Sequence, residues 1–298
     1  MSKLRLVIVV SADRSDLYFA NQLIKKLNVV GVIVENQRNQ PDRTPVAVKM
    51  LKLISRPHLL VAKVFNKATD KFRRKYAAYH QPQNTADFGE EGRKLFPGDH
   101  CAILYTAGVN DINAPENVEW LREMQPDLVA VCGASIFKKE LISIPAKGVL
   151  NLHGGLSQYY RGLYTTDWAI YNEQPEYVGA TVHYVSPGID DGDIVYQGRP
   201  EIEASDNPNS LYVKVVRLGV RMMERAIRDI ENGAVHPTAL LAKGDLYLGD
   251  TFTSKKRDAT WRKLRKGIIS EYLNNKDGRD KKVLDEMVND FNNVGRAS

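Results

Sequence analysis

Cysteines and long apolar runs are scarce in this sequence. Of its 298 residues only Cys101 and Cys132 are cysteines, and both lie in apolar stretches typical of strands. Buried, reduced thiols are therefore expected rather than a disulfide, which fits a reducing compartment. The apolar N-terminal run, Leu4–Val10, is too short for a signal peptide, and no run approaches the length of a membrane span. These absences predict a soluble, cytoplasmic protein.

Glycine-rich nucleotide loops and metal-ligand clusters are missing as well. The segment after the first apolar run, Ser11–Ser15, contains no glycine, so no Gly-x-Gly-x-x-Gly dinucleotide motif follows that strand. His153 and Asp190 are suitable metal ligands, but no second histidine stands at ligand spacing and the cysteines are scattered. We therefore expect neither a Rossmann cofactor nor a metal.

Alternating strands and helices are present instead. An apolar strand at Leu4–Val10, an amphipathic helix at Ser15–Leu27 and a strand at Val29–Val34 form a β-α-β opening. Such an opening implies a mostly parallel, twisted sheet with helices on both faces. Further elements are expected at Cys101–Leu104, Asn113–Met124, Leu128–Cys132, Thr165–Tyr171 and Asp206–Ile230.

The chain is long enough for one large core with a small appendage. Residues 1–236 are expected to form the main domain, interrupted by a basic helical insertion at 36–98. Residues 237–298 are expected to form a small, mainly helical C-terminal extension.

The formal charge of +6 comes mainly from two basic segments, residues 43–75 and 255–266. A solvated helix face is one explanation for each segment. The other is contact with an anionic substrate, an anionic partner or a membrane surface. No stable nucleic-acid partner is expected, and a homodimer is left open.

The stretch from Gly148 to Ile194 carries the candidate chemistry. An apolar strand ends in Asn151-Leu152-His153, and strand alternation directs Asn151 and His153 to the same side. A second strand, Gly179–Val185, is followed by a turn that contains Asp190. An amide can polarise a carbonyl oxygen, a histidine can move a proton near neutral pH, and a carboxylate can orient the histidine. On the residues alone, a capped strand end and a plain turn would explain the same pattern.

Several ordered motifs resemble the formyltransferase family, whose members use 10-formyltetrahydrofolate. The motifs are Asn151-x-His153, Arg161-Gly162, Gly179-x-Thr181-x-His183 and Asp190-x-Gly192, and the resemblance as a whole covers roughly residues 100–235. The resemblance implies a Rossmann-like formyltransferase core. It also implies that Asn151, His153 and Asp190 are catalytic and that His183 is structural.

The family resemblance also implies binding residues. The loop after the strand Leu128–Cys132 grips the folate in the family, here by way of Ser135, Ile136 and Phe137. The turn after the second strand is expected to contribute Ser186, Gly188 and Ile189. Tyr160, Arg161 and Gly162 match the family's substrate loop, although a Leu-Pro pair common in the family is absent before them.

The expected reaction is formyl transfer from 10-formyltetrahydrofolate to a primary amine, most like the sugar N-formyltransferase branch, whose acceptor is a nucleotide-linked amino sugar. The purine-pathway branch is disfavoured because its glycine-rich phosphate loop is absent near Ser11–Ser15. The initiator-tRNA branch is disfavoured because residues 237–298 have a helical pattern rather than that of its β-barrel. The alternatives are hydrolysis of the formyl donor, a methionyl-tRNA formyltransferase-like activity, and a non-catalytic folate-binding or scaffold protein.

Overall fold

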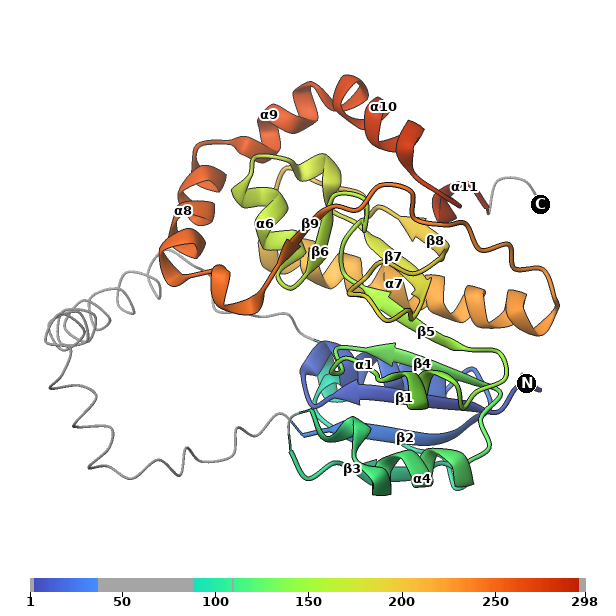
Figure 1. Cartoon of the computed structure of the whole chain (residues 1–298). Coiled ribbons are helices and arrows are strands. Elements are labelled where there is room, and N and C mark those ends of the chain that lie inside the picture. Colours follow the sequence, from blue (N-terminus) through green and yellow to red (C-terminus); the bar gives the residue numbers. More distant parts are fainter. Residues whose placement is uncertain (1–2, 37–87, 109, 295–298) are drawn as a thin grey trace, which may run out of the picture. The chain divides into compact units, whose positions relative to one another are not determined.

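The computed structural model describes residues 3–36, 88–108 and 110–294, which belong to one compact unit (Figure 1). The basic segment at 43–75, and most of the insertion expected at 36–98, lie outside the described residues.

A seven-stranded sheet forms the centre of this unit, in the order β3-β2-β1-β4-β5-β7-β8. The strands are β1 (Leu6–Ser11), β2 (Val29–Glu35), β3 (Ala102–Tyr105), β4 (Leu128–Cys132), β5 (Val149–His153), β7 (Ala180–Tyr184) and β8 (Ile194–Gly198). Strands β3, β2, β1, β4 and β5 run parallel, whereas β7 pairs antiparallel with β5 and β8 with β7. The expected mostly parallel sheet is confirmed.

Helices cover both faces of this sheet (Figure 1). One face packs against α1 (Arg14–Ile24) and α7 (Pro208–Glu231), and the other against α4 (Pro115–Glu123) and α5 (Lys139–Ile142). The remaining helices of the described residues are α6 (Thr165–Tyr171), α8 (Ser254–Arg265), α9 (Ile268–Asn274), α10 (Lys276–Glu286) and α11 (Phe291–Val294). Short 3₁₀ turns are η1 (Gly89–Gly92), η2 (Asp111–Asn113), η3 (Pro175–Tyr177) and η4 (Gly249–Thr251).

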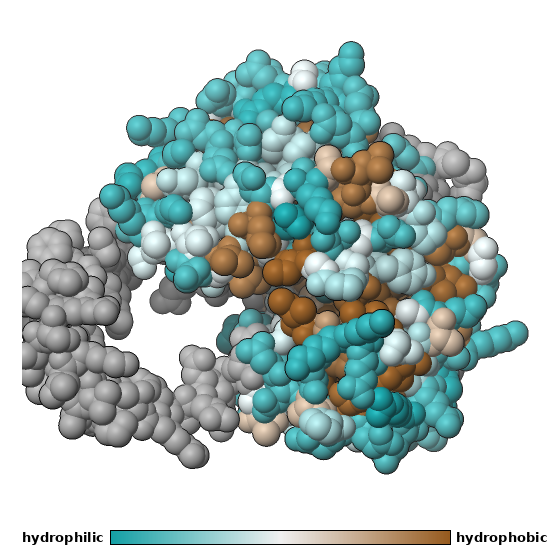
Figure 2. Space-filling view, in the orientation of Figure 1, coloured by the Kyte–Doolittle hydropathy of each residue, from teal (hydrophilic) through white to brown (hydrophobic). Residues whose placement is uncertain are grey.

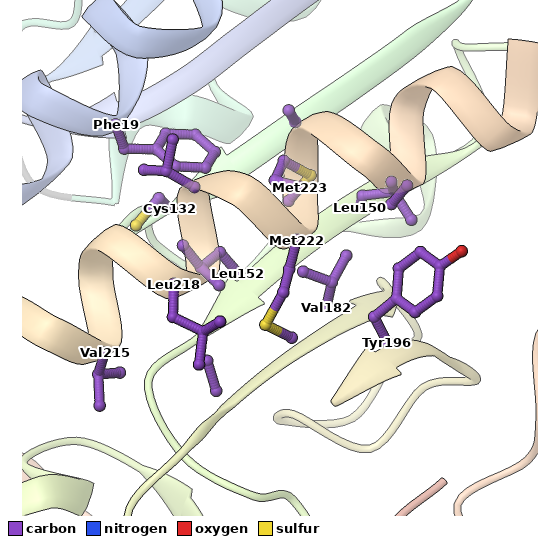
Figure 3. Packing of buried hydrophobic residues seen from close by; sticks show 14 of the residues in the cluster. Phe19, Cys132, Leu150, Leu152, Val182, Tyr196, Val215, Leu218, Met222 and Met223 are labelled. Carbon is purple, nitrogen blue, oxygen red and sulfur yellow. The ribbon is translucent and has the colours of Figure 1, made fainter. Parts of the chain in front are cut away.

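The two-sided burial explains why β1 is apolar at every position. Leu6, Ile8 and Val10 join the core beneath α1 and α7, while Val7 and Val9 join the core beneath α4. Strands buried on both faces read as continuous apolar runs rather than as an alternation. Figure 3 shows how side chains of α7 reach the sheet, with Leu218 and Met222 near Leu152 and Val182.

Helix α7 begins at Pro208, two residues after the expected start at Asp206, because a capping box fixes its N-terminus there. The Asn207 side chain accepts hydrogen bonds from the Asn209 and Ser210 N–H groups, and the Ser210 hydroxyl accepts one from the Asn207 N–H. Pro208 then occupies the first helical position, where its missing N–H costs nothing.

The segment after residue 236 is mainly helical, as expected. Helix α8 packs on α6, and α10 packs on η3. Its short strand β9 (Asp245–Tyr247) pairs in parallel with β6 (Tyr160–Gly162). The division into domains at residues 1–236 and 237–298 stays a prediction.

The two cysteines differ in their surroundings, and both thiols are free. Cys132 is buried at the end of β4. The expectation of a buried thiol is wrong for Cys101, which is only partly covered because it precedes the edge strand β3.

A buried carboxylate lies where β1 passes into α1. Asp16 accepts hydrogen bonds from the Ser11 hydroxyl (2.6 Å) and the Ser15 hydroxyl (2.8 Å), and no basic side chain of the described residues pairs with it. Burial raises the pKa of Asp16 to about 6, against the lowering effect of the two hydroxyls. The folded state therefore holds this proton more tightly than the unfolded chain does.

This difference predicts a pH-dependent stability. Between pH 3.8 and about 6 the folded protein loses about 3 kcal/mol of stability as pH rises, and the loss persists above that window. We expect Asp16→Asn to remove this loss, so that the variant gains stability relative to the wild type at about pH 7.5 but not at about pH 4. Urea unfolding of both proteins at the two pH values measures the difference. An exposed control, Asp99→Asn, should leave the pH dependence unchanged, and an Asp16→Asn protein that behaves like this control would contradict the prediction.

Candidate active site

Two neighbouring strands carry the polar side chains of the candidate site. In the antiparallel pair β5–β7, Asn151 lies directly opposite His183, and His153 lies opposite Thr181. Because side chains alternate along a strand, Asn151 and His153 share a face of the sheet. The antiparallel register brings His183 to Asn151, with the Asn151 Nδ2 atom 3.2 Å from His183 Nε2.

The turn after β7 places Asp190 against these side chains. Asp190 Oδ2 is 3.2 Å from His153 Nδ1, and Oδ1 is 3.5 Å from His183 Nε2. The Asn151 amide donates to Oδ1 at 3.2 Å, and the Gly162 backbone N–H donates to Oδ2 at 2.9 Å. One carboxylate thus joins β5, β7 and the β6 segment.

Electrostatics around Asp190 favour its ionised form. The side chain is only 12% exposed, and burial by itself would raise its pKa. The nearby His153 ring, the His183 ring and the Gly162 N–H outweigh burial and hold the pKa of Asp190 well below its usual range. A fixed negative charge therefore faces both imidazoles near neutral pH.

The two histidines are held in different ways. His153 Nε2 is 2.8 Å from the Tyr160 carbonyl oxygen, so each ring nitrogen of His153 faces an oxygen acceptor. Whichever ring nitrogen carries a hydrogen therefore has an oxygen to which it can donate. His183 Nδ1 lies 2.8 Å from its neighbour's carbonyl oxygen, that of Tyr184, which leaves Nε2 for Asn151 and Asp190.

Asn151 is fully used as a donor in this arrangement. Its Nδ2 atom approaches both Asp190 and His183, and the opposite amide orientation would direct an oxygen at the carboxylate. To donate a hydrogen bond to a substrate oxygen, Asn151 has to exchange one of these two bonds. Breaking the bond to His183 costs less than breaking the bond to Asp190, because hydrogen bonds to a carboxylate are the stronger ones.

The expected substrate loop is partly a structural segment. The Tyr160 side chain is 3% exposed, donates to Gln174 through its hydroxyl and stacks on Tyr247. It is therefore a core residue, and its carbonyl rather than its ring reaches the site. The ring packs inward because Tyr160 opens β6, whose partner β9 carries Tyr247.

Arg161 and Gly162 tie the loop to its neighbours. The Arg161 guanidinium donates to the carbonyl oxygens of Gly244 (2.9 Å) and Ile189 (3.2 Å). Gly162 has a φ of 89°, and a Cβ there would lie 2.2 Å from the Tyr247 carbonyl oxygen. Only glycine therefore permits the approach that brings this N–H to Asp190.

The loop expected to contact folate follows β4 and is pinned at both ends. The Ser135 N–H donates to the buried Glu35 carboxylate (2.7 Å). Asn113 donates to the Ile136 carbonyl (2.9 Å) and accepts from the Lys138 N–H (2.7 Å). The Ile136 side chain is 61% exposed, whereas Phe137 is buried. This loop therefore exposes the Ile136 side chain, whereas the Phe137 ring is part of the core, and the role of the loop in folate binding stays a prediction.

The second expected folate segment is built around Asp191. The Ser186 hydroxyl donates to Asp191 (2.6 Å), and Lys243 forms an ion pair with the same carboxylate (2.8 Å). A Cβ at Gly188 would lie 2.0 Å from that carboxylate. Ile189 contributes its carbonyl oxygen to Arg161. These contacts set the backbone path into Asp190, which adopts a left-handed φ of 48°.

The contacts of His183 and Glu35 were not predicted from the sequence. His183 had been assigned a structural part only, yet its ring contacts Asn151 and Asp190. The signal was available, because His183 shares a strand face with Thr181 and an antiparallel neighbour would place it opposite Asn151. Glu35 carried no motif, and only the strand order brings it beside the β4 loop.

Among the described residues, no group of histidine, cysteine, aspartate and glutamate side chains is arranged to hold a metal ion. In the same part of the chain, no helix combines the length and apolar character needed to cross a bilayer.

Comparison with known proteins identifies the family. A model of the formyl transferase family matches residues 47–227. The chain belongs to the formyl transferase family, as the motifs around Asn151 and Asp190 indicated.

A curated relative and two solved structures illustrate the similarity. A methionyl-tRNA formyltransferase from Caldanaerobacter subterraneus subsp. tengcongensis is 29% identical over 126 residues, covering 42% of this chain and 40% of that protein. The chain therefore matches less than half the length of this relative. A 4-N formyltransferase from Francisella tularensis superposes with a TM-score of 0.51 at 17% identity, covering 87% of each chain. Phosphoribosylglycinamide formyltransferase from Anaplasma phagocytophilum gives 0.51 at 16% identity, covering 83% of this chain and 98% of that one. At these identities the structural likeness concerns the fold.

The adjacent carboxylates Asp190 and Asp191 give a matched test of the site's electrostatics. Asp190→Ala leaves the buried His153 imidazole, the Asn151 amide and the Gly162 N–H without their acceptor, so we expect a loss of roughly 2–4 kcal/mol in the free energy of unfolding. Asp191→Ala removes an ion pair with Lys243, whose side chain is 54% exposed, and should cost less than about 1 kcal/mol. Urea unfolding at neutral pH compares the two, and equal losses would show that the cluster around Asp190 is not specially stabilising.

Proposed function

We propose that this protein transfers the formyl group of 10-formyltetrahydrofolate to the amine of a nucleotide-linked amino sugar. The observation that carries the proposal is the cluster of Asn151, His153 and Asp190 at the end of β5, in a member of the formyl transferase family. Ligands of parallel sheets bind outside the carboxyl ends of the strands, which is where this cluster lies.

The mechanism assigns a separate part to each side chain. The bound donor supplies an electrophilic formyl carbon. Asn151 exchanges its bond to His183 for one to the formyl oxygen and stabilises the negative charge that develops there as the unprotonated amine attacks. For the transfer to be completed, the bond between the formyl carbon and the donor nitrogen has to break as the bond to the amine forms, so that tetrahydrofolate leaves. His153 is positioned to move the proton lost by the attacking amine to that leaving nitrogen, and Asp190 keeps the His153 ring oriented. Because His153 Nε2 faces Tyr160, proton transfer at that nitrogen requires a shift of the Tyr160 carbonyl.

The loop after β4 offers a suitable edge for a planar heterocycle. The Ser135 N–H is occupied by Glu35, but the Ile136 and Phe137 N–H groups have no partner among the described residues. These amide donors, together with the exposed Ile136 side chain, can receive the polar edge and the flat face of a pterin ring. One oxygen of the buried Glu35 carboxylate, Oε1, also lacks a hydrogen-bond partner. The residues present therefore fit the donor.

An anionic acceptor is favoured by the surface beyond Gly162. Leu163, Tyr164, Leu246 and Leu248 are exposed there, and Figure 2 shows hydrophobic atoms gathered where β6 and β9 lie in Figure 1. Helix α8 begins beside this surface, with the Arg257 guanidinium 6.0 Å from the Phe252 ring, which in turn packs against Tyr164. The basic residues of α8 are Lys255, Lys256, Arg257, Arg262, Lys263 and Arg265. An aromatic side chain next to a basic helix suits the base and phosphates of a nucleotide.

A second candidate activity is formylation of methionyl-tRNA, which the curated relatives favour. Their similarity covers only part of their length, so it reports on the core that all these enzymes share. The positive charge of α8 is equally suited to the phosphates of RNA. Hydrolysis of the donor, with water in place of the amine, uses the same three side chains and is a further outcome of the assay below.

We expect a mass increase of one formyl group on an amino-sugar nucleotide when the protein, 10-formyltetrahydrofolate and a panel of such sugars are incubated together. Initiator methionyl-tRNA is the second arm, and formate release without any amine is the third. Asn151→Ala, His153→Ala and Asp190→Ala should each lower turnover by roughly a hundredfold or more, because each removes a group used in the transition state. Near-normal turnover by His153→Ala would contradict the assigned parts, and formylation of tRNA alone would replace the acceptor.

The acceptor surface predicts an effect on binding rather than on chemistry. Tyr164→Asn removes the ring while tolerating the left-handed backbone (φ 58°), and Arg257→Ala removes a charge. Each should raise KM for the nucleotide sugar roughly three- to tenfold and change kcat little, since neither contacts the Asp190 cluster. Steady-state kinetics with the preferred acceptor measures this. The control, Arg217→Ala, changes an exposed arginine on α7 and should leave KM as it is.

A further inference from the structure

The loop Gly154–Gly162 contacts the candidate catalytic side chains through its backbone. Its Tyr160 carbonyl oxygen lies 2.8 Å from His153 Nε2, and its Gly162 N–H donates to Asp190 at 2.9 Å. A displacement of this loop therefore moves the surroundings of both side chains together. The loop lacks a proline that would restrict it locally, so its position depends on contacts from elsewhere.

One set of contacts comes from the end of α10, which is remote in sequence. The Tyr159 hydroxyl donates to the Glu286 carboxylate. The Tyr159 ring also stacks on Tyr177, with ring centroids 4.0 Å apart and planes inclined by 20°. Tyr159 directly precedes Tyr160, so these contacts hold the residue next to the carbonyl that faces His153.

A second set runs through a pair of side-chain amides. Gln158 and Gln197 donate to each other, at 3.1 and 2.6 Å, and Gln197 is completely buried in β8. Gln197 also accepts the Val288 N–H at 3.0 Å and donates to the Thr181 hydroxyl at 3.2 Å. In addition, Gln158 donates to the Glu286 carbonyl oxygen at 3.4 Å. Buried polar groups that satisfy one another in this way favour a single geometry.

Asn289 fastens the same C-terminal segment to the core. Its side-chain amide donates to the carbonyl oxygens of Ile194 (3.2 Å) and His236 (3.0 Å). The Gln197 N–H donates to the Asn289 carbonyl oxygen at 3.3 Å. The segment is therefore attached to β8 independently of the loop and can serve as its support.

We propose that the C-terminal segment Glu286–Asn289 is a brace for the loop Gly154–Gly162, with Tyr159, Gln158 and Gln197 as positioning residues for the catalytic side chains. The proposal rests on the proposed function for its kinetic consequence. A proline within the loop would restrict its conformation locally. In this protein, contacts from the C-terminal segment restrict it instead. None of these residues contacts His153 or Asp190 through its side chain, so each acts through the Tyr160 carbonyl and the Gly162 N–H.

The test uses the full-length chain and the variants Glu286→Ala, Glu286→Gln and Gln158→Ala. In Glu286→Gln the side-chain amide oxygen still accepts from the Tyr159 hydroxyl, so this variant should retain most of the kcat that Glu286→Ala loses. Glu286→Ala and Gln158→Ala should lower kcat roughly five- to tenfold with little change in KM for the formyl donor, because misplacement affects the transition state more than binding. Lys282→Ala, on the exposed side of α10, is the control and should match the wild type.

Hydrogen exchange followed by mass spectrometry gives a second readout that needs no reaction. Amides of the loop, including those of Tyr160 and Gly162, should exchange several-fold faster in Glu286→Ala and Gln158→Ala, with β1 and β4 unchanged. Unchanged exchange and unchanged kcat in both variants would overturn the proposal. Faster loop exchange in a protein that formylates none of the acceptors would support the brace and refute the proposed function, so the two failures are distinguishable.

Discussion

The Asp190 carboxylate is held away from water between two imidazoles, an amide and a backbone N–H. Removing a carboxylate from water is costly, and the cost is offset only when the surrounding groups supply hydrogen bonds and positive charge. Here they do, because the pKa of Asp190 lies well below its usual range in spite of burial. The ionised carboxylate in turn orients His153 and Asn151. Every contact that places the turn Ser186–Asp191 therefore affects the candidate chemistry.

Three supports converge on that turn and on the facing loop. Arg161 links the loop to the Ile189 carbonyl, Lys243 neutralises Asp191, and the C-terminal segment reaches Gln158 and Tyr159. The antiparallel strands β7 and β8 make this convergence possible, because they lie at the edge of the parallel sheet and expose their connections to the later part of the chain. The extension after residue 236 consequently contributes to the site although it carries none of the matched motifs.

In the proposed function, the reaction and the recognition of the acceptor take place on different parts of the molecule. In the proposed reaction, Asn151, His153 and Asp190 act on a formyl group and an amine, which formyl transfer to any acceptor has in common. The remainder of an acceptor has to be recognised by other surfaces, such as the exposed side chains beyond Gly162 and the basic helix α8. Electrostatic attraction at such a surface raises encounter rates for anions but does not by itself distinguish a sugar nucleotide from RNA.

The sequence alone determined the β-α-β order, the two-sided burial of β1 and the motif residues Asn151, His153 and Asp190, because apolar periodicity and short motifs are local properties. It did not show that Tyr160 turns its ring into the core, that His183 joins the carboxylate, or that Glu35 and Glu286 support loops far from them in the chain. Those features depend on which strands become neighbours and on how the C-terminal helices pack, and they are decided by long-range contacts. A side chain's partner across such a contact leaves no regular spacing in the sequence, so only the tertiary structure reveals it.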